Sequence, residues 1–492
     1  MSKENGAGVA AIASAAVARP SWHRAFENLP REHGFESLRV EGSVPPDLSG
    51  TFYWNGPGLF SAFGQEYGHW FDGDGAVGAV RFGGGAPEGA VRVVQTRALL
   101  DERRAGRLLY SRALRRSPRP VREHLGGRRR NPANVNIIVH DGRLLALGQG
   151  SPVELSFEDL ATLGELDPDD AIVRSLCAHP RYSARRRALY GFGCVFGRRS
   201  AIEVYELRDG GARRCLATIP IAAPALVHDC CVTENHVLLV VPPLRVRVLP
   251  LMCNALPFWK CLDWSPAHGS ELLLVPIDAP ERVTRITMPA FFAFHFANAY
   301  ETRRGVVVDL PCSEDFEHLG RWLSGVARGD AEAMPDNTMR RLVADPQRRS
   351  VSLEPIDDAV GEMPRVSPLV QGEPHRFVYH AAFRTGARGG MPDLLRKLDV
   401  HARRGEAIDL GADTYPSEAV VVPRAGGGSE DAAYLLTLVY DGSTHTSHVA
   451  ILDAALPASP PLARVHFDHH VPFTFHGSWA GRRSAPARAL SP

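Results

Sequence analysis

Short apolar runs separated by turns dominate the chain from residue 38 onward. The runs are rich in Val, Leu, Ile and aromatic residues, and Asp-Gly, Gly-Gly or Asn pairs close many of them. This pattern is typical of β-strands, because strands are short and tight turns need residues that tolerate unusual backbone angles. We predict strands over residues 50–57, 75–82, 136–148, 189–195, 201–207, 237–241, 271–277, 305–309, 376–383, 395–401, 419–423, 433–440 and 448–452.

Helical periodicity is rare. Only residues 314–327 show a clear amphipathic period, and residues 22–29 and 160–166 are predicted to form short helices. Residues 69–71 (HWF) are interpreted as the end of an aromatic strand. Residues 103–130 are rich in Arg and lack an apolar period, so we expect a solvated loop. The sequence therefore predicts an all-β fold class.

The chain shows no obvious linker. Its 492 residues would suffice for several ordinary domains or for one large all-β domain, and 44% of them are apolar. We predict a mobile N-terminal tail over 1–20, a single domain over 21–480 and a C-terminal tail over 481–492. In a propeller of seven blades each blade would hold roughly 60 residues, which accommodates four strands and insertions.

Charge and cysteine content restrict the partners and the compartment. The net charge of +1 gives no reason to expect nucleic acid or an anionic membrane. The eight Cys residues form no CxxC pair, which favours reduced thiols in a cytoplasmic protein. No run of about twenty apolar residues is present, so no membrane-spanning helix is expected.

Four histidines lie in compact apolar or turn settings, and they are the main candidates for chemistry. His295 lies in the middle of FFAFHFANAYE, and His179, His228 and His476 have similar surroundings. A single buried His is more often a satisfied core residue than a ligand. These four are too far apart for a local motif, so they can meet only if the fold brings distant strands to one point, as a propeller or a closed barrel does. Four imidazoles suit Fe, Cu, Ni or Zn.

Residues 242–264 form an unusual insertion, PPLRVRVLPLMCNALPFWKCLDW. Apolar residues, among them Leu251 and Phe258, alternate with Arg and Lys. One interpretation is a packed crossover segment. The other is an apolar lip that dips into a membrane surface, with its basic residues at the level of the headgroups, which would make the protein peripheral on the membrane.

Eight stretches in order resemble the carotenoid cleavage oxygenases, a family that also includes stilbene-cleaving enzymes and a retinoid isomerohydrolase. They are distributed over residues 41–479, which is nearly the whole chain. The stretches are EGSVPPDLSGTFYWNGPG at 41–58, HWFDGDG at 69–75, AHPRY at 178–182, HDCCVTENHVLL at 228–239, FFAFHFANAYE at 291–301, GEMPR at 361–365, YPSEAVVVPR at 415–424 and FHGSW at 475–479.

The resemblance implies a seven-bladed β-propeller in which loop and helix insertions form a cap over an axial metal site. It also implies one non-haem Fe(II) per chain. The four matching imidazoles would be the iron ligands and would carry the catalysis: His179, His228, His295 and His476.

The family orients three ligand imidazoles through glutamates, and two of these positions match here, Glu362 and Glu418. At the third position this chain has Gln149, which offers an amide oxygen without charge. Many bacterial members place Thr beside the open iron position, where Val135 stands here. At these two positions the chain departs from the family pattern, and iron binding remains the expectation.

The implied reaction is addition of O₂ across one C=C bond of a carotenoid or apocarotenoid, giving two carbonyl products. No flavin, nicotinamide or haem motif is visible, so the electrons must come from the substrate. Phe294, Phe475 and Trp479 flank ligand positions and are expected to line a tunnel for an apolar polyene. Cleavage of a phenolic stilbene and a non-catalytic propeller scaffold are the alternatives. No protein partner is implied.

Overall fold

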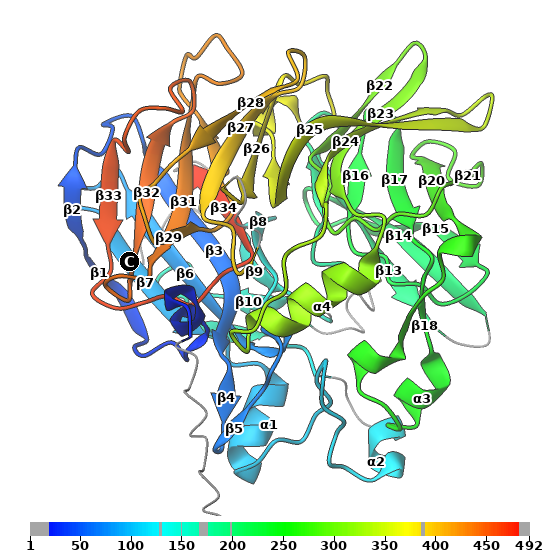
Figure 1. The fold of residues 1–492 in the computed structure, drawn as a ribbon, viewed down its shortest axis with the longest axis horizontal. Coiled ribbons are helices and arrows are strands. Elements are labelled where there is room, and N and C mark those ends of the chain that lie inside the picture. Colours follow the sequence, from blue (N-terminus) through cyan, green and yellow to red (C-terminus); the bar gives the residue numbers. More distant parts are fainter. Residues whose placement is uncertain are drawn as a thin grey trace, which may run out of the picture.

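The computed structural model describes residues 19–126, 130–148, 150–166, 176–196, 199–384 and 389–481. Most of the two predicted tails and Gln149 therefore lie outside the described residues. Strands dominate, as predicted, and helices are short (Figure 1). In the described part the strands form six sheets of four to seven strands and two small ribbons.

The first sheet contains both early and late segments of the chain. Its strands, in spatial order, are β1 (His33–Ser37), β7 (Glu88–Val93), β6 (Asp74–Phe82), β3 (Gly50–Leu59) and β34 (His476–Gly481). The second sheet holds β11 (Thr162–Glu165), β10 (Val153–Leu155), β9 (Arg143–Leu147) and β8 (Asn136–His140). The third holds β12 (Arg181–Ser183), β13 (Ala188–Val195), β14 (Ser200–Arg208) and β15 (Arg213–Ile221).

The remaining sheets follow along the chain. The fourth holds β16 (Cys230–Val232), β17 (His236–Val241), β20 (Ser270–Pro276) and β21 (Thr284–Met288). The fifth holds β22 (Asn298–Thr302), β23 (Gly305–Cys312), β24 (Thr338–Asp345), β25 (Ser350–Arg365), β26 (Phe377–Ala382), β27 (Leu394–Asp399) and β28 (Arg404–Ile408). The sixth holds β2 (Arg39–Gly42), β33 (Ala463–His466), β32 (Thr446–Asp453), β31 (Ala433–Asp441) and β29 (Thr414–Pro416), and β30 (Val420–Pro423) also pairs with β31.

Two pairings join the ends of the chain. β34 pairs with β3, with Asn55 opposite His476, and β2 pairs with β33, with Arg39 opposite His466. The fifth sheet is also joined in an unusual way. The first part of β25 pairs with β24, while Gly361 to Arg365 at its end pairs with β26. One long strand therefore belongs to two successive groups of strands.

The core lies between neighbouring sheets, and β17 shows why the strands are apolar on both faces. Val237 and Leu239 pack with residues of the third sheet, whereas Leu238 and Val240 pack with residues of the fifth. Successive side chains of a strand point to opposite faces, so a sheet between two others must be apolar at every position. This explains the continuous apolar runs of the sequence.

Helices and ribbons gather at one side of the sheets. The helices are α1 (Arg97–Ala105), α2 (Val121–Gly126), α3 (Val248–Met252) and α4 (Phe316–Val326), with short 3-10 helices η1 (Ser21–Phe26), η2 (Trp70–Asp72), η3 (Phe258–Cys261), η4 (Pro266–His268) and η5 (Pro368–Val370). In Figure 1, α1, α2, α3 and the ribbon β4 (Ser61–Ala62)–β5 (Gln65–Glu66) lie at the lower edge, and α4 crosses near the centre. The second ribbon, β18 (Leu244–Val246)–β19 (Leu262–Trp264), flanks α3 in the chain. Within the described residues no helix is long and apolar enough to cross a membrane.

The prediction of a helix over 160–166 is wrong. Residues Thr162–Glu165 pair with β10 in the second sheet, and Leu160 takes a left-handed backbone angle, φ 62°, that interrupts any helix. Residues 69–71 are not a strand end either. His69 caps the N-terminus of η2, and its Nδ1 accepts a hydrogen bond from the Phe71 N–H.

The predicted solvated loop over 103–130 is also wrong in part. Its first residues belong to α1, and α2 follows within the same stretch. Arg112 and Glu102 form a fully buried ion pair with an N–O distance of 2.8 Å, and Glu102 also accepts from the Leu109 N–H. The Arg-rich composition could not predict this ion pair, because composition does not show which guanidinium lies next to a buried carboxylate.

Candidate metal centre

Each of the four candidate histidines lies at the start of a strand at the end of a sheet. His179 lies two residues before β12, His228 two residues before β16 and His295 three residues before β22, and His476 is the first residue of β34. Each of these strands is an edge strand of a different sheet. Residues from the same end of each strand therefore meet, although they are far apart in sequence.

The imidazoles form a compact group. The Nε2 atoms of His179 and His228 are 3.1 Å apart, and one ring nitrogen from each of His179, His228 and His295 lies within 4.8 Å of the others. The ring of His476 is 4.7 Å from the rings of both His179 and His295. Nitrogen donors this close, without acid groups between them, suit a transition metal ion.

Burial keeps most of these rings neutral, as metal binding requires. Burial and the neighbouring rings hold the pKa of His179 and of His228 well below its usual value. Burial lowers the pKa of His476, and the Glu418 carboxylate opposes this only in part. Burial also disfavours the charged form of His295, but the charge and hydrogen bond of Glu362 outweigh it and raise that pKa.

Two buried carboxylates hold two of the rings in place. The Nδ1 atoms of His295 and His476 lie 2.8 Å from carboxylate oxygens of Glu362 and Glu418, respectively. Hydrogen bonds at Nδ1 leave Nε2 of each ring free to face the centre. The Nε2 atom of His295 is buried and has no hydrogen-bond partner among the described residues, as expected for an atom that binds a metal.

Arg365 keeps Glu418 ionised. Its guanidinium donates to Glu418 and to the Gly477 carbonyl, both at 2.7 Å. Burial alone would raise the pKa of Glu418, but Arg365 and His476 lower it to about 2. The bulge in β25 next to Glu362 places Met363 at φ 59°, and the Met363 N–H donates to the Glu362 carboxylate. Such bulges re-aim side chains within a strand.

Sequence reasoning missed a second set of residues that join the ligand strands. Asp229 accepts hydrogen bonds from Arg181 at 2.6 Å and from the Phe296 N–H at 2.9 Å. These three residues follow His179, His228 and His295 within two positions, so one carboxylate ties three strands together. The acidic residue directly after His228 was the only local signal, and its partners lie on other strands.

Comparison with known proteins places the chain in a family. A family model described as retinal pigment epithelial membrane protein matches residues 26–481. The apocarotenoid-15,15'-oxygenase of Synechocystis sp. is 30% identical over 473 residues, covering 93% of this chain and 96% of that protein. The chain belongs to the carotenoid cleavage oxygenase family. It is therefore an oxidoreductase of the dioxygenase type.

Other members of the family agree with this assignment. A carotenoid 9,10(9',10')-cleavage dioxygenase 1 of Phaseolus vulgaris is 27% identical, covering 90% of this chain and 86% of that protein. The structure of cobalt-substituted Synechocystis ACO matches with a TM-score of 0.86 and 28% identity, covering 94% of this chain and 98% of that chain. ACO has a propeller fold, and this carotenoid cleavage oxygenase shares it. A cobalt form of the relative agrees with a metal site at the histidine cluster.

Aromatic side chains of this family member surround the histidines on one side. The Phe294 ring lies 4.9 Å from the His228 ring, and the Phe71 ring is 6.1 Å from Phe294 and 5.5 Å from Phe475. Phe294 and Phe475 belong to one apolar cluster that also includes residues of α4. Trp479 does not join them. Its ring lies 6.1 Å from that of Phe82, against a different cluster.

Val135 lies beside the histidines. The backbone N–H of His476 donates to the Val135 carbonyl at 3.3 Å, and the Val135 side chain packs against the apolar cluster that includes Ala178, the residue before His179. Leu251 lies in α3 and Phe258 in η3, and both side chains are half-buried. Their neighbours Leu249 and Met252 are 74% and 42% exposed.

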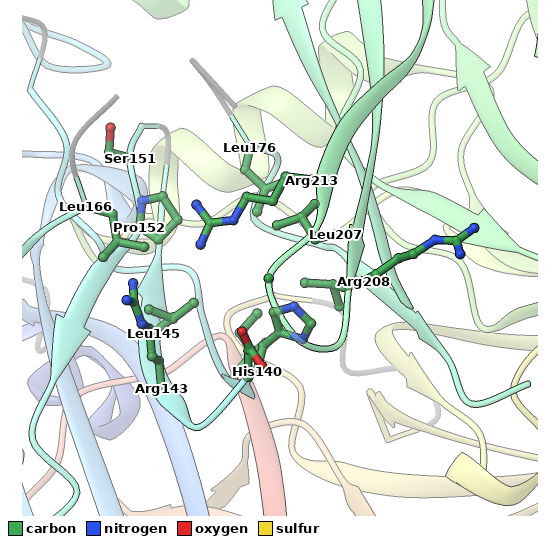
Figure 2. A pocket seen from close by; sticks show the side chains of 14 residues that line it. His140, Arg143, Leu145, Ser151, Pro152, Leu166, Leu176, Leu207, Arg208 and Arg213 are labelled. Atoms are coloured by element: carbon green, nitrogen blue, oxygen red, sulfur yellow. The ribbon is translucent and has the colours of Figure 1, made fainter. Parts of the chain in front are cut away.

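A pocket between the second and third sheets is separate from this centre. Figure 2 shows apolar residues such as Leu145 and Leu207 in its wall, and Arg213 extending toward Pro152. None of the four histidines lines the pocket. It is therefore not the metal centre of the oxygenase.

Proposed function

We propose that this protein is a non-haem Fe(II) dioxygenase that cleaves one C=C bond of a carotenoid or apocarotenoid. One O₂ is consumed for each bond, and each former alkene carbon receives one oxygen atom to become a carbonyl. The observation that carries the proposal is the convergence of four imidazoles, two of them aimed by buried carboxylates, in a family whose relatives are named for carotenoid and apocarotenoid cleavage.

The proposed iron ligands are His179, His228, His295 and His476. Bound iron would supply the activation of O₂, which the side chains of this chain cannot do by themselves. Glu362 and Glu418 would orient two ligands through Nδ1. Val135, whose carbonyl accepts from the backbone N–H of His476 and whose side chain packs on the cluster that includes Ala178, would narrow the space beside the metal without offering a hydroxyl.

We further propose a seven-bladed arrangement around this centre. Seven inner strand ends each bring one residue toward it, if β25 is counted only by the part that pairs with β26. The residues are His476 (β34), Val135 (before β8), His179 (before β12), His228 (before β16), His295 (before β22), Glu362 (β25) and Glu418 (before β30). Pairing between early and late strands supports a single domain over 21–480.

The helical side of the molecule would form the cap. A chain of ring contacts runs from His228 through Phe294 and Phe292 to Phe316 at the start of α4, with centroid distances of 4.9, 4.7 and 4.7 Å. These apolar rings would exclude water and hold one double bond of a polyene over the centre. The exposed face of α3 would be the apolar lip that contacts a membrane surface.

The function is tested with purified iron-loaded protein, O₂ labelled with ¹⁸O, and a panel of carotenoids, apocarotenals and phenolic stilbenes. We expect two carbonyl products from a carotenoid or apocarotenal, each carrying one labelled oxygen before exchange with water. His295→Ala should lose both bound iron and turnover. If only the stilbenes are cleaved, the substrate class is phenolic stilbenes and not carotenoids. If the iron-loaded protein cleaves no member of the panel, the proposal is refuted.

A further inference from the structure

A second pair of facing imidazoles lies where the beginning and the end of the described chain meet. His33 is the first residue of β1 in the first sheet, and His469 lies in the segment between β33 and β34. Their Nε2 atoms are 3.1 Å apart, and the two residues are only 9% and 8% exposed. The resemblance to the family and the proposed reaction assign nothing to this pair.

Hydrogen bonds fix the protonation pattern of both rings. The Nδ1 atom of His33 lies 2.9 Å from the Gly34 carbonyl oxygen, and that of His469 lies 2.8 Å from the His470 carbonyl oxygen. A carbonyl oxygen only accepts, so each Nδ1 must carry the proton. Each neutral ring then has a lone pair at Nε2. Two lone pairs would face each other across 3.1 Å, which is unfavourable unless a cation lies between them.

The same geometry occurs at the metal centre of this protein. There the Nε2 atoms of His179 and His228 are also 3.1 Å apart. Zinc–nitrogen bonds of about 2.0–2.1 Å would give an N–Zn–N angle of about 100° at this separation, close to tetrahedral. Metal-bound imidazoles usually donate their other N–H to a carbonyl or carboxylate, as both rings of this pair do.

The charged groups around the pair favour a cation between the two rings. Arg31 bonds Glu36 at 2.5 Å and Asp468 at 3.0 Å, so these three groups carry one net negative charge beside the pair. Glu36 also reaches within 3.6 Å of Nδ1 of His33.

We propose that His33 and His469 bind a divalent transition metal ion of the zinc type, with water completing its coordination. The ion would clamp β1 to the segment that follows β33. That segment leads directly to Phe473, Phe475 and His476, so the clamp would help to hold one wall of the oxygenase centre. Its role is structural, because neither residue contacts the proposed iron ligands in the described structure.

The test uses full-length protein without a histidine tag, stripped with a chelator and dialysed against excess zinc. Elemental analysis should find two zinc ions per chain in the wild type and one in His33→Gln or His469→Gln. His401→Gln, at an exposed turn, is the matched control and should retain two. Added zinc should raise the Tm of the wild type and the control more than that of either variant.

A diffraction experiment decides the matter even if the variants fail to fold. A crystal of zinc-treated wild type should give anomalous peaks at the zinc edge at two places, the four-histidine centre and the His33–His469 pair. A single zinc ion per chain, a second zinc ion that persists in both variants, or a map with no peak between His33 and His469 would each overturn the proposal.

Discussion

Glu362 and Glu418 show how much of the centre depends on single hydrogen bonds. Each accepts from the Nδ1 of one imidazole, and each is also fixed by a backbone N–H, that of Met363 or of Gly477. A carboxylate held in this way restricts the ring to one tautomer and one direction. Two buried carboxylates thereby fix the orientation of two of the four imidazoles.

Replacing either carboxylate by an amide should therefore weaken the centre without unfolding the protein. Glu362→Gln and Glu418→Gln are expected to reduce iron affinity or turnover by about 10- to 100-fold, because the amide removes the charge and can present its N–H to Nδ1. Iron content by elemental analysis and steady-state turnover measure the effect. Glu301→Gln is the matched control, since Glu301 bonds His236 at 3.0 Å outside the centre. Equal losses in all three variants would contradict this role.

His448 offers a second prediction at this scale, about pH. It is buried, its Nε2 has no hydrogen-bond partner in the described structure, and burial together with His466 lowers its pKa to about 4. In the unfolded chain the pKa of His448 is about 6.5. At pH values between about 4 and 6.5 the imidazole is therefore protonated in the unfolded state but neutral in the native state. Stability should fall as the pH drops from about 6.5 to 4, by about 3 kcal/mol.

His448→Leu should flatten that part of the profile. The measurement is the free energy of unfolding in urea at several pH values between 7 and 4, compared with wild type. His268→Leu, at an exposed position, should keep the wild-type slope. A His448→Leu profile as steep as that of the wild type would show that His448 does not cause the acid sensitivity.

The sequence could identify most residues of the centre but few of those that hold them. Four histidines in apolar settings were visible locally, and the resemblance to the family pointed to the two glutamates. Arg181, Asp229 and Arg365 were not, because each acts on partners that are distant in sequence. Trp479 was included for its position near His476, yet it packs against a different apolar cluster from Phe475. Gln149 lies outside the described residues, so its role stays a prediction.

At the scale of elements, hydrophobic periodicity predicted most strands and α4, but it did not predict short helices such as α1. α4 begins as predicted because Asp315 caps it, accepting from the Glu317 and His318 N–H groups, and because its apolar face packs on the aromatic cluster. α1 escaped prediction, although Thr96 caps it and Glu102 anchors its end. The buried Arg112–Glu102 pair that fixes this region needs tertiary structure, so no local period could show it.

α3 carries the prediction of membrane contact. None of its residues is fully buried, and the exposed side chains of Leu249 and Met252 would each favour bilayer insertion by roughly 1.5–3 kcal/mol before ordering costs. Replacing both with Ser should abolish co-sedimentation with liposomes while preserving the Tm. Turnover of detergent-dispersed substrate should also be kept.

The earlier candidates in this segment serve as a contrast. Leu251 and Phe258 are half-buried, so Leu251→Ser with Phe258→Ser should lower the Tm as well as binding. Leu456→Ser, at an exposed leucine outside the segment, is the control and should leave binding unchanged. If the wild-type protein does not co-sediment with liposomes, α3 is not a membrane-binding lip but an exposed surface turn.

At the scale of the whole molecule, the shared sheets predict cooperative unfolding. β3 loses one of its partner strands if β34 detaches, and β2 loses its partner if β33 detaches. β25 joins the two halves of the fifth sheet. Loss of one sheet should therefore release its neighbours. We expect one transition in urea, with coincident far-ultraviolet circular dichroism and tryptophan fluorescence. Two separated transitions would instead indicate independent domains within residues 21–480.

The pairing of early with late strands has a further meaning for protein engineering. Because the two ends of the described chain are held in sheets that they share, the place where the chain starts is not what makes the structure close. A circular permutant that joins the old ends through a flexible linker, and opens a new start in the Gly-rich turn between β30 and β31, would keep every strand pair. The new ends would then be available for fusing a reporter or a second enzyme, at a point that adjoins none of the four histidines in sequence.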